Sequence, residues 1–198
     1  QQRERLGTVR SDEVNEWSTG VYASYDYQWT SRLRTNVSLR YDYFDFDVNS
    51  LVDTNIYNVA LAPNDGETSD DLWSFKGSAN YLLTDDAELY LSAGQGFHSN
   101  DARGTVTSVD PNNGDAVDSV DPLVRTFGYE VGVRWRPNAK FNSSLALWSL
   151  EQDSELLFVG DAGNTEASRP SKRQGIELAA YYNYSDQLSF DLEYAYTD

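Results

Sequence analysis

The feature that most constrains this chain is a set of apolar residues at every second position, interrupted by short and long polar connections in strict alternation. The short connections are Thr30-Ser31-Arg32, Thr84-Asp85-Asp86, Pro137-Asn138-Ala139-Lys140 and Ser185-Asp186-Gln187. The long ones run from Asn49 to Asp70, from Asn100 to Pro122 and from Gly160 to Arg169. Strands of ~10 residues, with tight turns at one rim and long loops at the other, are typical of a transmembrane β-barrel. We therefore predict an all-β fold of about eight antiparallel, up-and-down strands.

The alternation gives each segment two different faces. The apolar row of one segment is Phe127, Tyr129, Val131, Val133 and Trp135, and its opposite row is Gly128, Glu130, Gly132, Arg134 and Arg136. Segment 141–151 is the least regular, because Trp148 and Leu150 fall on the otherwise polar row. We expect the apolar rows to face lipid and the polar rows to face a wet lumen.

The composition excludes membrane helices and permits a barrel. Mean hydropathy is -0.62, the net charge is -17, and the longest run of hydrophobic residue types extends only from Leu178 to Tyr182. A membrane helix needs ~20 consecutive apolar residues. A barrel strand shows lipid only its alternate side chains, so its mean hydropathy can stay low while one face is fully apolar.

A soluble antiparallel sandwich is the main alternative, since its sheets also alternate between apolar and polar rows. It explains less well why short and long connections alternate. It also does not explain strands longer than the globular mode of ~5 to 6 residues. Residues 1–15 are polar and loop-like, and the sequence stops directly after a strand at Tyr196-Thr197-Asp198. We therefore expect an arc of a larger barrel rather than a complete small one.

Several segments resemble strands in the C-terminal half of TonB-dependent outer-membrane receptors. They are Gly20-Val21-Tyr22-Ala23, Leu39-Arg40-Tyr41-Asp42, Leu89-Tyr90-Leu91-Ser92-Ala93-Gly94-Gln95-Gly96-Phe97, Tyr129-Glu130-Val131-Gly132 and Gln174-Gly175-Ile176-Glu177-Leu178. The resemblance implies a plugged barrel of ~22 strands in the outer membrane of a Gram-negative bacterium. It also implies import energised by the TonB complex, most often of ferric siderophores.

The resemblance sets our expectations for domains, function and partners. Residues 1–198 are expected to be a segment of the receptor-like barrel domain, with the plug domain and the closing strands outside it. The expected function is TonB-energised uptake of a scarce nutrient such as a ferric siderophore. A passive porin or surface adhesin is the alternative, and a soluble carbohydrate-binding sandwich is a more distant one. Expected partners are the plug, TonB, a small-molecule ligand, outer-membrane lipid and lipopolysaccharide. The acidic balance argues against nucleic acid.

The sequence carries no enzyme signature. There is no Gly-x-Ser-x-Gly elbow, no phosphate-binding glycine loop, no cysteine and only one histidine, His98. A catalytic triad or a histidine-based metal cluster lacks its partners, so we predict no catalytic residues, no cofactor and no metal site. The acidic turn Asp110–Asp115 has oxygen ligands suited to calcium, but it lacks the spacing and closing glutamate of a calcium loop.

Four residues at the outer ends of strands are candidates for ligand contact. His98 follows the segment Gly94-Gln95-Gly96-Phe97 on the predicted lumen side, and Asn100, Arg103 and Arg125 lie nearby in sequence or across the loop. In a receptor of this kind, ligand meets the upper lumen wall and the bases of the loops. The alternative is that His98 only forms a hydrogen bond within a loop.

Charged residues are also predicted on the lumen side. The bases are Arg40, Arg134, Arg136, Lys172 and Arg173, and the acids are Glu88, Glu130, Glu177, Asp191 and Glu193. A polar wall for a charged plug or ligand is one interpretation. Mutual neutralisation in a wet lumen is the other, and such exposed pairs stabilise by only ~0 to 1 kcal/mol each.

Overall fold

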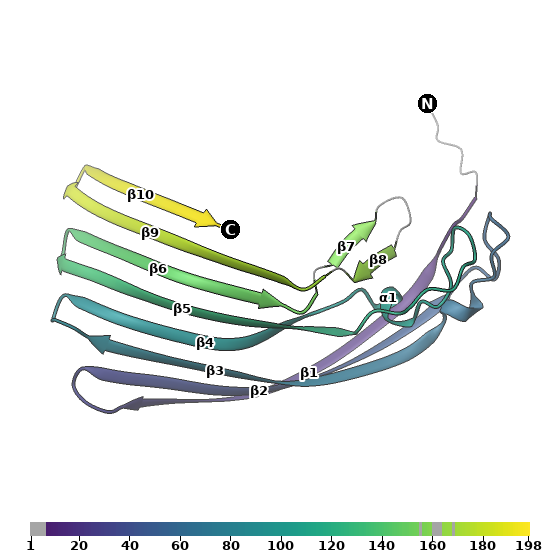
Figure 1. Cartoon of the computed structure of the whole chain (residues 1–198), viewed down its shortest axis with the longest axis horizontal. Helices are drawn as coiled ribbons and strands as arrows, with labels where there is room; N and C mark the ends of the chain where they lie inside the picture. The colour runs from purple at the N-terminus through teal and green to yellow at the C-terminus, as the bar shows by residue number, and fades with distance from the viewer. Residues whose placement is uncertain (1–6, 155, 160–163, 168) are drawn as a thin grey trace.

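The computed structural model is one curved antiparallel sheet of eight strands with loops gathered at one end (Figure 1). It describes residues 7–154, 156–159, 164–167 and 169–198. Strand order is β1-β2-β3-β4-β5-β6-β9-β10, and β7 pairs separately with β8. Neighbours in sequence are thus neighbours in space, and the sheet stays open between β1 and β10. The predicted all-β, up-and-down arc of about eight strands is confirmed.

The strands of the large sheet are longer than most globular strands. Their bounds are β1 Asp12–Gln28, β2 Leu33–Ser50, β3 Gly66–Leu82, β4 Ala87–Ser99, β5 Leu123–Asn138, β6 Phe141–Gln152, β9 Ser171–Ser185 and β10 Leu188–Thr197. The smaller elements are the 3-10 helix η1 Ala62–Asn64, the helix α1 Ala102–Val106, and the hairpin β7 Leu156–Val159 with β8 Asn164–Ala167. Within the described residues, no helix is long and apolar enough to cross a membrane.

The four short connections link strands as predicted, although Pro137, Asn138 and Ser185 belong to strand ends, and three outer boundaries differ. β1 begins at Asp12, inside the segment predicted to be loop-like, and β3 begins at Gly66, inside the predicted loop Asn49 to Asp70. The β2–β3 ladder continues to the pair Val48↔Gly66 because β2 still has packing partners for its side chains there. The third connection begins at Asp153 and contains the β7–β8 hairpin, while 160–163 and 168 lie outside the described residues.

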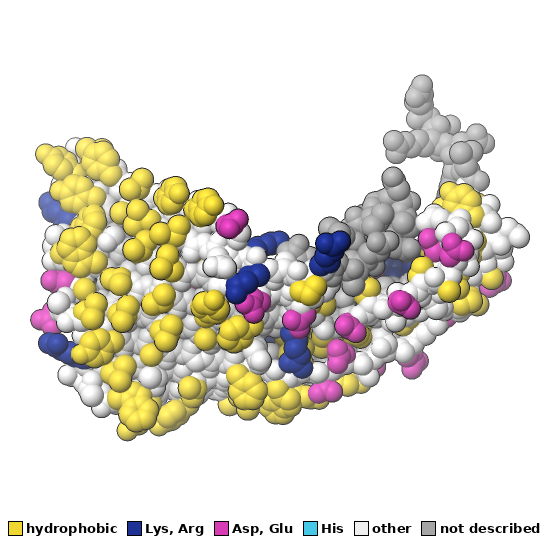
Figure 2. Space-filling model, in the orientation of Figure 1, with side chains coloured by type: hydrophobic (Ala, Val, Ile, Leu, Met, Phe, Trp, Pro, Cys, Tyr) yellow, Lys and Arg dark blue, Asp and Glu magenta, His cyan; other side chains and the backbone are white. Residues whose placement is uncertain are grey.

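The outer face of the sheet is apolar and uncovered. In Figure 2 hydrophobic side chains form a broad band over the half of the sheet near the short turns, and acidic side chains gather toward the loops. Along the band, Val21 is 68%, Leu91 54% and Leu192 57% exposed. Edge-to-face aromatic pairs lie at the turn end, with ring centroids 4.7 Å apart for Tyr27 and Trp29 and 5.5 Å apart for Trp135 and Phe141. An aromatic rim below an apolar band is the expected lipid face of a barrel.

On the inner face, large side chains lie across glycines of the neighbouring strand. A Cβ atom at Gly132 would stand 2.5 Å from the ring of Tyr90, and one at Gly175 would stand 2.5 Å from the ring of Trp148. The register pairs these residues directly, as Tyr90↔Gly132 and Trp148↔Gly175. Glycine is required here for space, not for its backbone freedom. The irregular row of β6 is thereby explained, because Trp148 does lie on the inner face.

A small core lies at the loop end of the inner face. Phe46 and Val48 of β2 are fully buried against Ala102 of α1, with Phe44 and Val106 packed beside them. The alternation of β2 therefore carries apolar residues on its inner row above the membrane band. These residues hold the second loop over the inner face.

Candidate functional site at the loop end of the inner face

The first and second outer loops are joined by two asparagine side chains. Asn55 Nδ2 donates to the carbonyl of Pro111 (2.5 Å), and Asn64 Nδ2 donates to that of Val109 (2.9 Å). The Asn64 side-chain oxygen also accepts from the N–H groups of Ser108 and Val109, each at 2.9 Å. An amide side chain has both donors and an acceptor, so it can replace the backbone partners that loops lack. Loops 51–65 and 100–122 therefore form one ordered unit.

Two of the predicted ligand contacts, Asn100 and Arg103, form bonds within the second loop. Asp101 caps α1 by accepting from the Arg103 N–H at 3.0 Å, and its carboxylate forms an ion pair with the Arg103 guanidinium at 2.5 Å. This pairing lowers the pKa of Asp101 and raises the pKa of Arg103. Asn100 is 3% exposed and donates to the Asp121 carbonyl at 2.6 Å. The charge of Arg103 is thus already compensated inside the loop.

The other two candidates lie on different rows of the wall. His98 pairs with Val124 on the inner row, and its Nε2 is buried without a hydrogen-bond partner among the described residues. The side-chain oxygen Oδ1 of Asn100 is also buried without a hydrogen-bond partner among the described residues. Arg125 is exposed on the row of Phe127, and its Nη1 donates to the Trp73 carbonyl at 3.3 Å. His98 and Asn100, two residues apart, thus each keep a buried polar atom without a described partner, whereas Arg125 lies on the opposite row.

A basic pocket that the sequence did not indicate lies lower on the inner face, across strands β1 to β4. It has a volume of about 440 Å³ and is lined by Tyr22, Ser38, Arg40, Ser74, Lys76, Gln95, Gly96 and Phe97. Arg40 donates through Nε and Nη2 to the buried carboxylate of Asp42, both at 2.6 Å. Lys76 forms no ion pair within the described part of the chain. Cross-strand register assembles this pocket, and single-strand patterns do not contain that information.

The predicted charges on the lumen side are partly paired. Arg134 forms an ion pair with Glu88 at 2.9 Å and lies 4.2 Å above the ring centroid of Tyr90. The placement of Lys172 on the lumen side is wrong. The β6–β9 register pairs Lys172 with Glu151, and the two form an ion pair at 2.6 Å on the row opposite to Trp148.

No group of three or more histidine, cysteine, aspartate or glutamate side chains suited to a metal ion occurs among the described residues. In the turn Asp110–Asp115, one Asp110 oxygen accepts from the backbone and side-chain nitrogens of Asn112, at 2.8 and 3.1 Å. Asp115 likewise accepts from Asn113 at 2.9 Å. These carboxylates shape the turn.

The single curved sheet, apolar outside and polar inside, defines the class of the protein as part of an outer-membrane-type β-barrel wall. A family model described as TonB dependent receptor-like, beta-barrel matches residues 3–198. The chain belongs to this family. Its members are transport receptors whose barrels lie in the bacterial outer membrane.

Solved structures of transport receptors share the fold. The copper transporter OprC aligns with a TM-score of 0.71 and 18% identity over 94% of this chain and 30% of that protein. The alcaligin receptor FauA from Bordetella pertussis gives 0.64 and 18%, over 94% of this chain and 30% of that one. The ferric yersiniabactin uptake receptor FyuA from Yersinia pestis gives 0.67 and 18%, over 96% and 28%. The chain therefore spans less than a third of each of these proteins.

Proposed function

We propose that this chain is part of the wall of an active importer in the outer membrane of a Gram-negative bacterium, and that the cargo is a ferric siderophore. The observation that carries the proposal is membership of the receptor family across residues 3–198. Two of the solved structures of similar fold are named for alcaligin and for ferric yersiniabactin. A plug domain of the same protein and the TonB complex belong to this proposal as partners.

We place the ligand contact at the base of the outer loops. His98 Nε2 and Asn100 Oδ1 are buried polar atoms without partners, and such atoms are uncommon unless a further group satisfies them. Arg103 follows shortly after them in α1, and its side chain is 41% exposed despite the ion pair with Asp101. Arg125 is a contact in this proposal only for a ligand that reaches the outer rim of β5.

The test is uptake of radioactive iron by cells that carry or lack the gene, supplied with ferric alcaligin, ferric yersiniabactin or a catecholate siderophore. Uptake should require both the gene and a working TonB complex. Gene-dependent uptake that persists without TonB would support the passive porin instead. Copper is included in the panel because OprC has the same fold. His98→Ala should lower uptake without lowering the amount of receptor in the membrane, and Arg34→Ala at the opposite rim is the control.

A further inference from the structure

Strand β3 is paired along its whole length on one edge only. Its ladder with β2 runs from Leu33↔Tyr81 to Val48↔Gly66. Its ladder with β4 begins at Leu82↔Glu88 and stops at Lys76↔Gly94. β4 itself stays paired with β5 up to Ser99↔Leu123. The two strands part toward the loops (Figure 1), so a seam opens in the wall above Lys76 and Gly94.

Polar side chains replace the missing ladder along this seam. Gln95 Oε1 accepts from the Phe75 N–H at 3.4 Å, and Arg125 Nη1 donates to the Trp73 carbonyl at 3.3 Å. Both polar residues interrupt rows that are otherwise apolar. Unpaired backbone groups are costly at membrane depth, and these side chains satisfy two of them. The sequence is thus adapted to an open seam.

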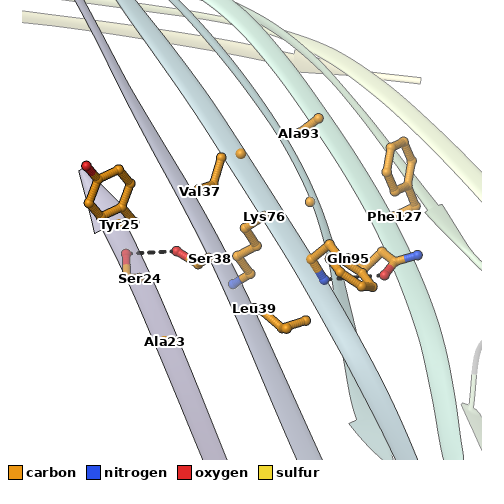
Figure 3. A pocket seen from close by; sticks show the side chains of 13 residues that line it. Ala23, Ser24, Tyr25, Val37, Ser38, Leu39, Lys76, Ala93, Gln95 and Phe127 are labelled. Atoms are coloured by element: carbon orange, nitrogen blue, oxygen red, sulfur yellow. Dashed lines mark hydrogen bonds between the residues drawn. The ribbon is translucent and has the colours of Figure 1, made fainter. Parts of the chain in front are cut away.

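Cavities lie on both sides of the seam and meet at it. The outer cavity has a volume of about 670 Å³, with Tyr25, Leu39, Phe75 and Phe127 among its lining residues (Figure 3). One of the cavities on the inner face is the basic pocket of about 440 Å³, and a second, of about 630 Å³, reaches the seam from the side of Glu130 and Glu177. Lys76 and Gln95 line both the outer cavity and the basic pocket. Only side chains, and no continuous backbone ladder, separate an apolar groove on the lipid face from a cationic pocket on the lumen face.

The inner pocket has unused capacity to bind an anion. Ser74 is 4% exposed, lines the pocket, and its Oγ has no hydrogen-bond partner among the described residues. Arg40 binds Asp42 through Nε and Nη2, so these two bonds leave its Nη1 unused. Arg40, Lys76 and Asp42 together carry a formal charge of +1, which one monoanion would neutralise. A guanidinium, an ammonium and a hydroxyl are strong donors to a carboxylate.

We propose that the seam between β3 and β4 is a binding site for a single-chain fatty carboxylate. Its head group is bound by Lys76, Arg40 Nη1 and Ser74 Oγ on the inner face. Its aliphatic tail passes beside Gln95 and lies in the outer groove against Leu39, Phe75 and Phe127. The site is independent of the proposed siderophore uptake, since its occupancy requires neither iron nor TonB.

The test uses the complete receptor in lipid nanodiscs, with dodecanoate that carries a photoreactive diazirine at the end of its tail. Mass spectrometry should find the label on groove residues such as Phe75 or Phe127. Loss of one charge-assisted bond in Lys76→Gln should lower the labelling about tenfold, equivalent to about 1.4 kcal/mol. Arg34→Gln removes a cation from the inner row near the opposite rim and should leave the labelling unchanged.

A second variant tests the groove without touching the head-group pocket. Ala93→Phe fills the outer cavity, which Ala93 lines, and should abolish labelling there. Ala87→Phe makes the same substitution on the same row of β4, outside the cavity, and should have no effect. Both variants keep an apolar residue on the lipid face, and unchanged thermal unfolding will show that they fold.

Three results would overturn the proposal. Equal labelling by the matching uncharged dodecanol probe would remove the role of the cations. Label spread evenly over the apolar band would show ordinary contact with lipid. Stronger labelling by dodecyl phosphate would contradict the assignment to a monoanion and would point to a phosphorylated lipid.

Discussion

The two edges of β3 show how differently one strand can be held in the same wall. Toward β2 the ladder is continuous and is reinforced by side-chain contacts, such as Tyr41 with Trp73 at 4.9 Å between ring centroids. Toward β4 the ladder stops at Gly94, and Gly96 follows two residues later. The same two glycines lie within the β4–β5 ladder, which stays continuous through Gly94↔Gly128 and Gly96↔Thr126. The comparison shows that glycines alone do not end a ladder, and that β4 follows β5 rather than β3 toward the loops.

The largest expected effect comes from placing a charge on the outer face away from the seam. Val131→Arg puts an arginine on the same outer row as Arg125. Unlike Arg125, which donates to the Trp73 carbonyl, it would have no open backbone group to bind, because the ladders on both sides of Val131 are complete. It should destabilise the complete barrel by roughly 2 to 4 kcal/mol if it lies near the midplane. Urea unfolding in lipid vesicles measures this loss.

Two matched variants sharpen that result. Arg125→Leu should cost much less, because it removes one hydrogen bond at the seam and leaves an apolar side chain facing lipid. Glu130→Arg points to the lumen and should also be tolerated far better than Val131→Arg. Similar losses for Val131→Arg and Glu130→Arg would contradict the assignment of the two faces.

The second largest loss of stability is expected when a glycine beside a continuous ladder, Gly132, is replaced by alanine. Gly94, beside the seam, is the matched position. A Cβ at Gly132 would stand 2.6 Å from the backbone oxygen of Leu145 as well as against Tyr90, so Gly132→Ala should cost about 1 to 3 kcal/mol through overpacking. At Gly94 the nearest atom is the Lys76 side chain at 2.7 Å, which can move. Gly94→Ala should therefore destabilise less in the same unfolding assay, and the reverse order would mean that the seam is the tighter contact.

A smaller effect is expected from Gln95→Leu. The variant removes the acceptor of the Phe75 N–H, which has no ladder partner on that side. One neutral hydrogen bond contributes about 1 kcal/mol, so protection of the Phe75 amide against hydrogen exchange should fall several-fold. The amide of Leu39, within the continuous β2–β3 ladder, serves as the internal reference. Unchanged exchange at Phe75 would show that Gln95 is not its cap.

The smallest effect is the pH response of the second loop. Arg103 lowers the folded-state pKa of Asp101 below the ordinary value of 3.8. The ion pair therefore stabilises the loop fully above that value and is lost as the pH falls through the lower, folded-state pKa. The amide chemical shift of Arg103 should titrate with a midpoint below 3.8 and should lose this transition in Asp101→Asn. A midpoint at or above the ordinary value would contradict the pairing.

The fold was predictable from sequence because alternation and turn spacing are local signals. Rows such as Val131 and Trp135 against Glu130 and Arg134 define two faces without knowledge of any neighbouring strand. The place where pairing ends is not a local signal. Gln95 and Arg125 do break their apolar rows, and that irregularity was the available sign of the seam.

The candidate site was less accessible to sequence analysis. His98 and Asn100 could be placed at the end of β4, but the partners of Arg103 and Arg125 depend on loop packing and on the gap beside β3. The pocket of Arg40, Ser74 and Lys76 depends on the register between β2 and β3. A shift of one residue would turn the side chains of one strand to the other face of the sheet. The misplacement of Lys172 has another origin, because local alternation alone sets it on the apolar row of Ile176 and Leu178.

The amide bridges of Asn55 and Asn64 have a consequence for the speed with which the proposed importer would capture its ligand. A loop that is ordered before it meets its ligand loses little conformational entropy on binding. Its association rate is then limited by encounter and orientation rather than by a folding step. Because the bonds of Asn55 and Asn64 join the two loops, neither loop can open alone without breaking them, so in the proposed importer these bonds oppose separate opening of either loop.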